Sequence, residues 1–134
     1  MKRGLTISRE HWREMLDHIH RHAPLEACGL LAGRHDSVEK VIAVRNHAQS
    51  PVRFVMDPYE QLQAFEWIES NQLDLLGIFH SHPNGPEVVS DADIAEAAYE
   101  VIHIIWSPSE EGWRARGFWI ENGRASEVSL QIVD

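Results

Sequence analysis

The sequence predicts a single α/β domain, a sandwich in which about three helices flank a mixed β-sheet. Three observations predict this class. The length of 134 residues suits one domain. Its 43% hydrophobic and 25% charged residues match globular proteins. Segments with helical periodicity alternate with short apolar runs of strand length. We therefore expect one domain spanning residues 1–134, whose strand order does not follow from sequence alone.

A first helix is predicted from Ser8 to about His22. Ser8 can cap it, apolar side chains recur on one stripe from Trp12 to Ile19, and Pro24 follows its end.

Two strands forming a hairpin are predicted next. Glu26–Gly33 is short, apolar and closed by glycine, and Val38–Arg45 resembles its neighbour across a turn at residues 35–37. Phe54-Val55 is expected to pair briefly with the same sheet.

A second helix is predicted to begin at Asp57-Pro58, where aspartate can cap and proline suits the first turn, and to end near Asn71. Leu73–His82 then predicts a strand. Pro83–Pro86 ends it, because two prolines and a glycine cannot continue a β-ladder.

A third helix is predicted from Ser90 to about Tyr99, followed by a buried strand at Val101–Trp106. The stretch Trp113–Val133 is expected to fold back at Asn122-Gly123, a strong hairpin signal.

The charge and the apolar runs exclude several classes of partner. A formal charge of −9 repels phosphate backbones and anionic lipid, so nucleic acid is not expected to bind. The longest apolar runs are too short to span a bilayer, and the N-terminal segment does not resemble a secretory signal. We expect a cytoplasmic protein without a membrane partner.

Cys28 is the only cysteine, which excludes an internal disulfide and a four-thiolate zinc site. Any metal must be held by histidine and carboxylate. We expect Cys28 to be a small buried hydrophobe. The histidines outside the segment 80–82, including His18 and His22, are expected to be solvated.

The segment from His80 to Asp93 suggests metal chemistry. Residues i and i+2 of a strand share a face, so His80 and His82 can direct two imidazoles at one point. A carboxylate of Asp93, in the first turn of a helix, could supply a third ligand at roughly 2.0–2.2 Å. Three protein ligands would leave one position of a zinc ion open, and bound zinc lowers the pKa of its water to about 7.

Two further residues are candidates for catalysis of amide hydrolysis. The leaving amine must be protonated as the bond breaks, and Glu26 lies at the mouth of an apolar strand where a solvated carboxylate is unexpected. The hydroxyl of Ser90 could donate a hydrogen bond to an oxyanion.

Each feature also has a structural explanation. A His-x-His pair on a strand is more often ordinary structure than a metal site, and Ser90 with Asp93 makes a good helix start. Spacing alone does not favour Asp93 over Asp91, nor Glu26 over Glu10 or Glu14.

An early glutamate followed by His-x-His-Pro-x6-Ser-x-x-Asp resembles the signature of the JAMM, or MPN+, metalloproteases. The resemblance runs from Pro24 to about Ile105 and is to compact prokaryotic members. It implies a fold similar to that of cytidine deaminases and one zinc ion, Zn2+. The residue roles it implies are as follows: His80, His82 and Asp93 as metal ligands, Glu26 as general base and then acid, and Ser90 as oxyanion helper.

The resemblance also implies a substrate. The family cleaves peptide or isopeptide bonds after the C-terminal Gly-Gly of ubiquitin-like proteins, and in compact members the implied substrates include sulfur-carrier proteins. Release of an amino acid such as cysteine from a carrier would use the same chemistry. A homodimer is compatible with this assignment. Val89 departs from the proline that many relatives have before the serine.

Two other functions are kept as alternatives. Related MPN domains without metal ligands act as assembly scaffolds, although all the ligands are present here. The segment His80–Gly85 also resembles the RadC-type domain, against which the acidic charge argues.

Overall fold

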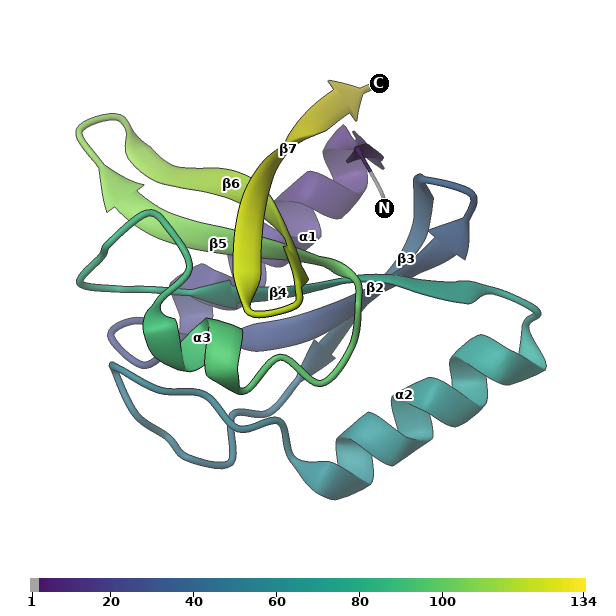
Figure 1. Cartoon of the computed structure of the whole chain (residues 1–134), viewed down its shortest axis with the longest axis horizontal. Coiled ribbons are helices and arrows are strands. Elements are labelled where there is room, and N and C mark those ends of the chain that lie inside the picture. Colours follow the sequence, from purple (N-terminus) through teal and green to yellow (C-terminus); the bar gives the residue numbers. More distant parts are fainter. Residues whose placement is uncertain (1–2) are drawn as a thin grey trace.

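The structure, a computed structural model that describes residues 3–134, confirms the expected α/β class. Its elements in chain order are β1 (Gly4–Ser8), α1 (Arg9–His22), β2 (Cys28–Arg34), β3 (Ser37–Val44), α2 (Pro58–Ser70), β4 (Asp74–Ser81), α3 (Asp91–Ala95), β5 (Ile102–Ser109), β6 (Gly112–Glu121) and β7 (Arg124–Val133). Figure 1 shows α1 behind the strands and α3 in front of them. Within residues 3–134, no helix is both long and apolar enough to cross a membrane.

The sheet is mixed, as expected, and it curls until its edges meet. Its strand order is β1-β3-β2-β4-β5-β6-β7, with β4 and β5 parallel and the hairpins antiparallel. β1 runs parallel to β7 over five paired residues, and the barrel closes where Thr6 pairs with Ser37. The sequence did not predict this closure.

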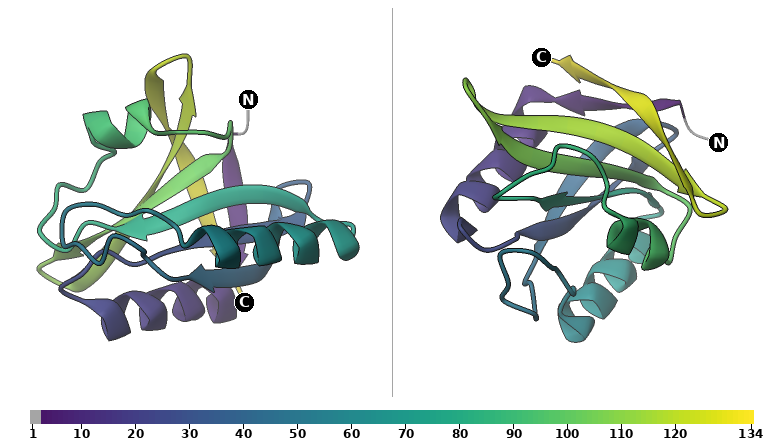
Figure 2. Two further views of the ribbon diagram at one scale, coloured as in Figure 1. Left: turned by 90° about the horizontal axis from the view of Figure 1, so that it is seen from below. Right: turned by 60° about the vertical axis from the view of Figure 1, so that its left-hand side comes forward.

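The central strands β2 and β4 are buried on both faces, which explains their nearly continuous apolar sequence. Leu31 and Phe79 belong to the core that receives α1, whereas Leu30 and Ile78 belong to the core under α2. The turned views of Figure 2 show α1 and α2 running along different sides of the molecule. The candidate functional site described below lies on the face of the sheet that α2 covers.

Several predicted helix ends are confirmed by their capping contacts. The hydroxyl of Ser8 accepts a hydrogen bond from the amide of His11 at 3.1 Å. The carboxylate of Asp57 accepts hydrogen bonds from the first turn of α2, which ends before Asn71 as expected. The predicted turn at Asn122-Gly123 joins β6 to β7, with both residues at positive φ.

Other predictions were wrong in extent. β1 was missed, because its five residues directly precede a helix and only Leu5 and Ile7 alternate as buried side chains. β2 begins at Cys28, so Glu26 lies just before the strand. The predicted pairing of Phe54-Val55 is reduced to one bridge between Asn46 and Met56.

The third helix was also predicted too long. It ends at Ala95, with Glu96 as its C-cap, although the sequence predicted helix to about Tyr99. No residue of α3 is buried, so no apolar stripe stabilises further turns. The fifth strand, in contrast, starts at Ile102 and extends beyond the predicted end at Trp106 to Ser109.

Candidate metal centre

His80 and His82 lie at the end of β4, where the strand is tied to the segment just before β2. Ser81, between them, is fully buried, and its hydroxyl accepts a hydrogen bond from the amide of Ala27 at 2.9 Å. The amide of Ser81 donates in return to the carbonyl of Ala27 at 3.0 Å. Alternation along the strand therefore points both histidines to the α2 face. His80 is 0% exposed and His82 is 6% exposed.

Asp93 reaches the same point from the first turn of α3. The hydroxyl of Ser90 accepts a hydrogen bond from the amide of Asp93 at 3.0 Å, and the amide of Ser90 donates to the Asp93 carboxylate at 2.8 Å. This reciprocal pair is a capping box. It turns the carboxylate of Asp93 back toward the histidines, so capping and contact with the histidines occur together.

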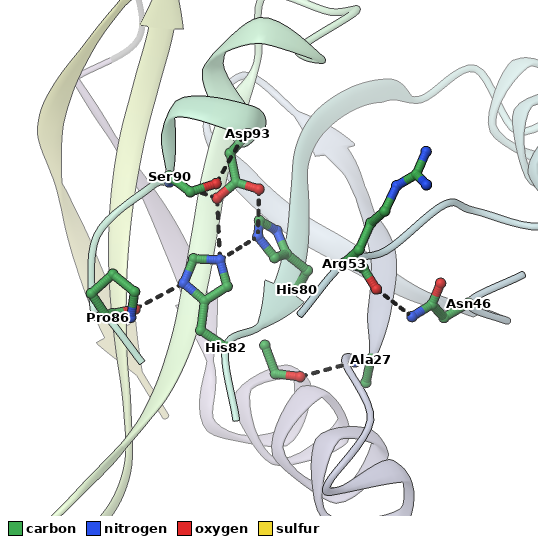
Figure 3. A network of polar contacts seen from close by, with 9 residues as sticks. Ala27, Asn46, Arg53, His80, His82, Pro86, Ser90 and Asp93 are labelled. Atoms are coloured by element: carbon green, nitrogen blue, oxygen red, sulfur yellow. Dashed lines mark hydrogen bonds and ion pairs between the residues drawn. The ribbon is translucent and has the colours of Figure 1, made fainter. Parts of the chain in front are cut away.

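The nitrogens of the two histidines and the oxygens of Asp93 converge (Figure 3). The two Nε2 atoms lie 3.1 Å apart, and each faces one oxygen of Asp93, at 3.3 Å for His80 and 3.1 Å for His82. Ligands held tetrahedrally at about 2.0–2.1 Å from zinc would be separated by roughly 3.3 Å. The donor set and its spacing therefore fit a zinc site.

The second nitrogen of His82 is already engaged. Its Nδ1–H donates to the carbonyl of Pro86 at 2.8 Å, so in the neutral imidazole the lone pair of Nε2 is directed at the centre. His80 is stacked on Phe54, with ring centroids 4.3 Å apart. The two imidazoles are thus held by different neighbours.

Burial and mutual contact shift the pKa values of the ionisable side chains in the centre. Burial alone would raise the pKa of Asp93, but hydrogen bonds from His80 and His82 lower it far below its usual range. Burial lowers the pKa of His80. Burial also opposes protonation of His82, yet its hydrogen bond to Asp93 raises the pKa of that imidazole. Asp93 is therefore ionised at neutral pH.

Glu26 lies beside the two histidines and is only 4% exposed. One of its carboxylate oxygens is within 4.8 Å of a ring nitrogen of His80 and of His82. Burial raises the pKa of Glu26 to about 7, with a further increase from Asp93 and a decrease from His82. Both protonation states of this carboxyl are therefore populated near neutral pH.

A cavity of about 160 Å³ opens onto these groups, with Glu26, His82, Ser90 and Asp93 in its lining. A neighbouring cavity of about 330 Å³ is lined by His80, Asp93 and several apolar side chains. The smaller cavity is therefore the one onto which both Glu26 and Asp93 open.

Asn46 is a residue of the site whose role the sequence did not predict. Its Nδ2 donates to the carbonyls of Glu26 and Arg53, both at 3.0 Å (the second is drawn in Figure 3). Its Oδ1 accepts from the amides of Ala48 at 3.0 Å and Val55 at 2.9 Å. Asn46 thus joins the backbone of Glu26 to the loop that carries Phe54. Its only sequence signal was that it lies within the range, Pro24 to about Ile105, over which the chain resembles the JAMM family.

Replacing Asn46 with alanine is expected to lower the free energy of unfolding by about 2–4 kcal/mol, because four backbone groups lose their partner. Urea unfolding measures this loss. Asn71→Ala is the control, since Asn71 is exposed and its side chain donates only to the carbonyl of Trp67. Equal losses in the two variants would contradict a special role for Asn46.

The expectation that the remaining histidines are solvated was wrong for two of them. His18 is 6% exposed and its Nε2 lies 3.0 Å from the carbonyl of Cys28. It lies next to the buried apolar residues of α1, so its side chain packs between the helix and β2. His103 is 4% exposed on β5, where both neighbouring residues are also buried.

Cys28 is fully buried, as expected, and burial raises the pKa of its thiol to about 12. The thiol is therefore protonated at neutral pH, which argues against a nucleophilic role.

Comparisons with known proteins agree with this arrangement. Residues 8–120 match the family model described as prokaryotic homologs of the JAB domain. A probable TtuB-protein conjugate cleaving protease from Thermus thermophilus is 38% identical over 130 residues, covering 96% of this chain and 83% of the relative. The CysO-cysteine peptidase of Mycobacterium tuberculosis is 28% identical over 134 residues, covering 97% of this chain and 92% of the relative.

A solved structure gives the same result for the fold. The solution structure of protein DSY2949 from Desulfitobacterium hafniense superposes with a TM-score of 0.88 at 34% sequence identity. The match covers 97% of this chain and 93% of that chain.

Proposed function

The chain belongs to the family of prokaryotic homologs of the JAB domain, and we infer that it is a zinc-dependent peptidase of the JAMM type. Its substrates are peptide or isopeptide bonds that follow the C-terminal Gly-Gly of ubiquitin-like or sulfur-carrier proteins. One observation carries this conclusion: two histidines and an aspartate converge, and the buried carboxylate of Glu26 lies within 4.8 Å of both imidazoles.

We propose that one zinc ion is held by Nε2 of His80, Nε2 of His82 and a carboxylate oxygen of Asp93. When bound, the ion would acidify water and polarise the carbonyl under attack. Asp93 is assigned as the ligand because its oxygens lie 3.1 and 3.3 Å from the two Nε2 atoms. The carboxylate of Glu26, which lies within 4.8 Å of both imidazoles, is kept for proton transfer.

We assign proton transfer to Glu26. An amine is a poor leaving group as an anion, so its nitrogen must gain a proton while the C–N bond breaks. The carboxylate of Glu26 would take a proton from the attacking water and then give it to this nitrogen. A pKa of about 7 suits both steps, since neither the acid nor the base form is scarce at neutral pH.

Ser90 is assigned to the carbonyl oxygen of the substrate. Its hydroxyl oxygen accepts from the amide of Asp93, which leaves the hydroxyl hydrogen available for donation into the smaller cavity. A hydrogen bond to the developing oxyanion would stabilise the transition state.

Replacing Ser90 with alanine is expected to lower kcat about 10²–10³-fold through loss of this donor. The same change removes a helix cap, which costs about 1 kcal/mol of stability. Steady-state kinetics on a Gly-Gly-linked amide, together with urea unfolding, separate the two effects. A variant that is less stable but has unchanged kcat would restrict Ser90 to capping.

The CysO-cysteine peptidase among the relatives favours a second substrate form for the same chemistry. In that form the leaving group is a free amino acid, such as cysteine, at the C-terminus of a carrier protein. Deconjugation instead releases the ε-amine of a lysine on another protein. Both forms require the carbonyl of a glycine to enter the smaller cavity.

The test begins with elemental analysis of the purified protein for zinc. The zinc-loaded protein is then incubated with a ubiquitin-like protein carrying an isopeptide-linked lysine, and with a carrier carrying a C-terminal cysteine. Mass spectrometry identifies which adduct is trimmed after Gly-Gly, and an Ala-Ala version of each is the control. Failure to trim either adduct would overturn the substrate assignment, and a protein that binds no zinc would favour the scaffold alternative.

A further inference from the structure

The loop of residues 83–89 connects the ligand His82 to the capping residue Ser90, so its conformation sets the geometry of the centre. The backbone of this loop contacts the centre directly, because the carbonyl of Pro86 accepts the hydrogen bond from His82 Nδ1 at 2.8 Å. That contact fixes which nitrogen of His82 carries the proton. What holds Pro86 in place therefore matters for metal binding.

Glu87, the next residue, is bound to a strand outside the site. Its carboxylate accepts from Arg116 Nη1 of β6 at 3.0 Å and lies 3.6 Å from Arg114 Nη1. Arg116 is also bonded to both oxygens of Glu127 on β7, by Nε at 2.9 Å and Nη2 at 2.7 Å. One guanidinium thus joins the loop of residues 83–89 to the β6–β7 hairpin.

The bidentate contact with Glu127 orients Arg116 before it meets Glu87. A guanidinium paired in this way has a fixed plane, so its remaining Nη1 points in a defined direction. The Arg116 side chain is 23% exposed, compared with 60% for Arg114. Arg116 is therefore the better ordered of the two partners of Glu87.

We propose that Arg116 is a positioning residue that holds the loop 83–89, through Glu87, in the conformation in which Pro86 orients His82 for metal binding. This inference rests on the proposed zinc site. It means that contacts within the chain hold the loop in this conformation. It also makes the retention of metal sensitive to ionic strength, because the Glu87 contact is partly solvated.

The expected effect lies in metal release. Loss of a partner that orients a metal ligand lowers affinity 10–100-fold, and Arg116 acts one residue farther out. We expect zinc to dissociate about five- to tenfold faster from Arg116→Gln and from Glu87→Gln than from the parent protein. The double variant should release zinc no faster than either single variant, since both changes remove the same contact.

The experiment follows zinc transfer from the loaded protein to a colorimetric chelator. Arg114→Gln is the matched control, expected to stay within about twofold of the parent because its contact is long and exposed. In the metal-free proteins, long-range ¹⁵N–¹H NMR should show a smaller fraction of His82 with the proton on Nδ1 in Arg116→Gln. Similar melting temperatures of the metal-free forms would separate positioning from general destabilisation.

Additive acceleration in the double variant, or equal acceleration by Arg114→Gln, would overturn the proposal. If the variants fold poorly, the parent protein provides a second test. Raising the salt to about 1 M, where the Debye length is about 3 Å, should accelerate zinc release. A release rate independent of salt would also overturn it. Normal zinc binding and hydrolysis would meanwhile leave the proposed function intact, whereas failure to bind zinc would remove both.

Discussion

Glu26→Gln is expected to retain zinc and to lose about 10²–10⁴-fold in kcat, the usual contribution of a general acid–base residue. The substitution keeps the size and shape of the side chain but removes its ability to exchange a proton. The metal should remain because Asp93, not Glu26, contacts both Nε2 atoms. Zinc content by elemental analysis and turnover of a Gly-Gly-linked amide are measured on the same sample.

Glu14→Gln is the control for this change, since Glu14 is an exposed residue of α1 and spacing alone did not exclude it. It should leave both zinc and turnover unchanged. Undiminished turnover in Glu26→Gln would remove Glu26 from the mechanism. Loss of zinc in that variant would instead make Glu26 a ligand.

Asp93→Asn is expected to lower zinc affinity at least about 100-fold, more than removal of an outer partner of a ligand usually costs. Asparagine preserves the shape and can still accept the hydrogen bond from the amide of Ser90. It lacks the negative charge, however, that holds a divalent cation. Competition with a chelator measures the affinity, and turnover without added zinc should fall in parallel.

The neighbouring Asp91→Asn is a matched control two residues away. Asp91 is exposed in the same first turn of α3, so its replacement makes the same change in net charge and helix dipole. It should retain zinc and turnover. Equal losses in the two variants would show that the charge of the helix start, rather than coordination by Asp93, is responsible.

Much of the fold could be predicted from sequence because many of its signals are local. The caps at Ser8 and Asp57 and the Asn122-Gly123 turn act through neighbouring residues, and the structure contains all three. Closure of the barrel depends instead on β1, whose partners lie about 30 and 125 residues along the chain. Local periodicity carries no information about such pairs.

Sequence spacing and the family resemblance together predicted which residues meet in the candidate site. His80 and His82 share a strand face, and a capping box directs Asp93 back to them, so periodicity and capping explain much of this geometry. The supporting contacts were not predictable. Asn46 bonds to four backbone groups, and Arg116 bonds to side chains on two other segments. These contacts exist only once the strands have been placed.

The reciprocal hydrogen bonds between Ala27 and Ser81 also bear on how this architecture tolerates insertions. They join positions 54 residues apart, one next to Glu26 and the other between the two histidines. Turns between them that do not contact the site can change in length without altering the spacing of Glu26 and the two histidines, provided β2 and β4 stay paired. Loop lengthening costs little free energy, roughly 0.6 kcal/mol per doubling. The exposed turn at Asn71-Gln72, between α2 and β4, is therefore a suitable place to graft a recognition module or a tag.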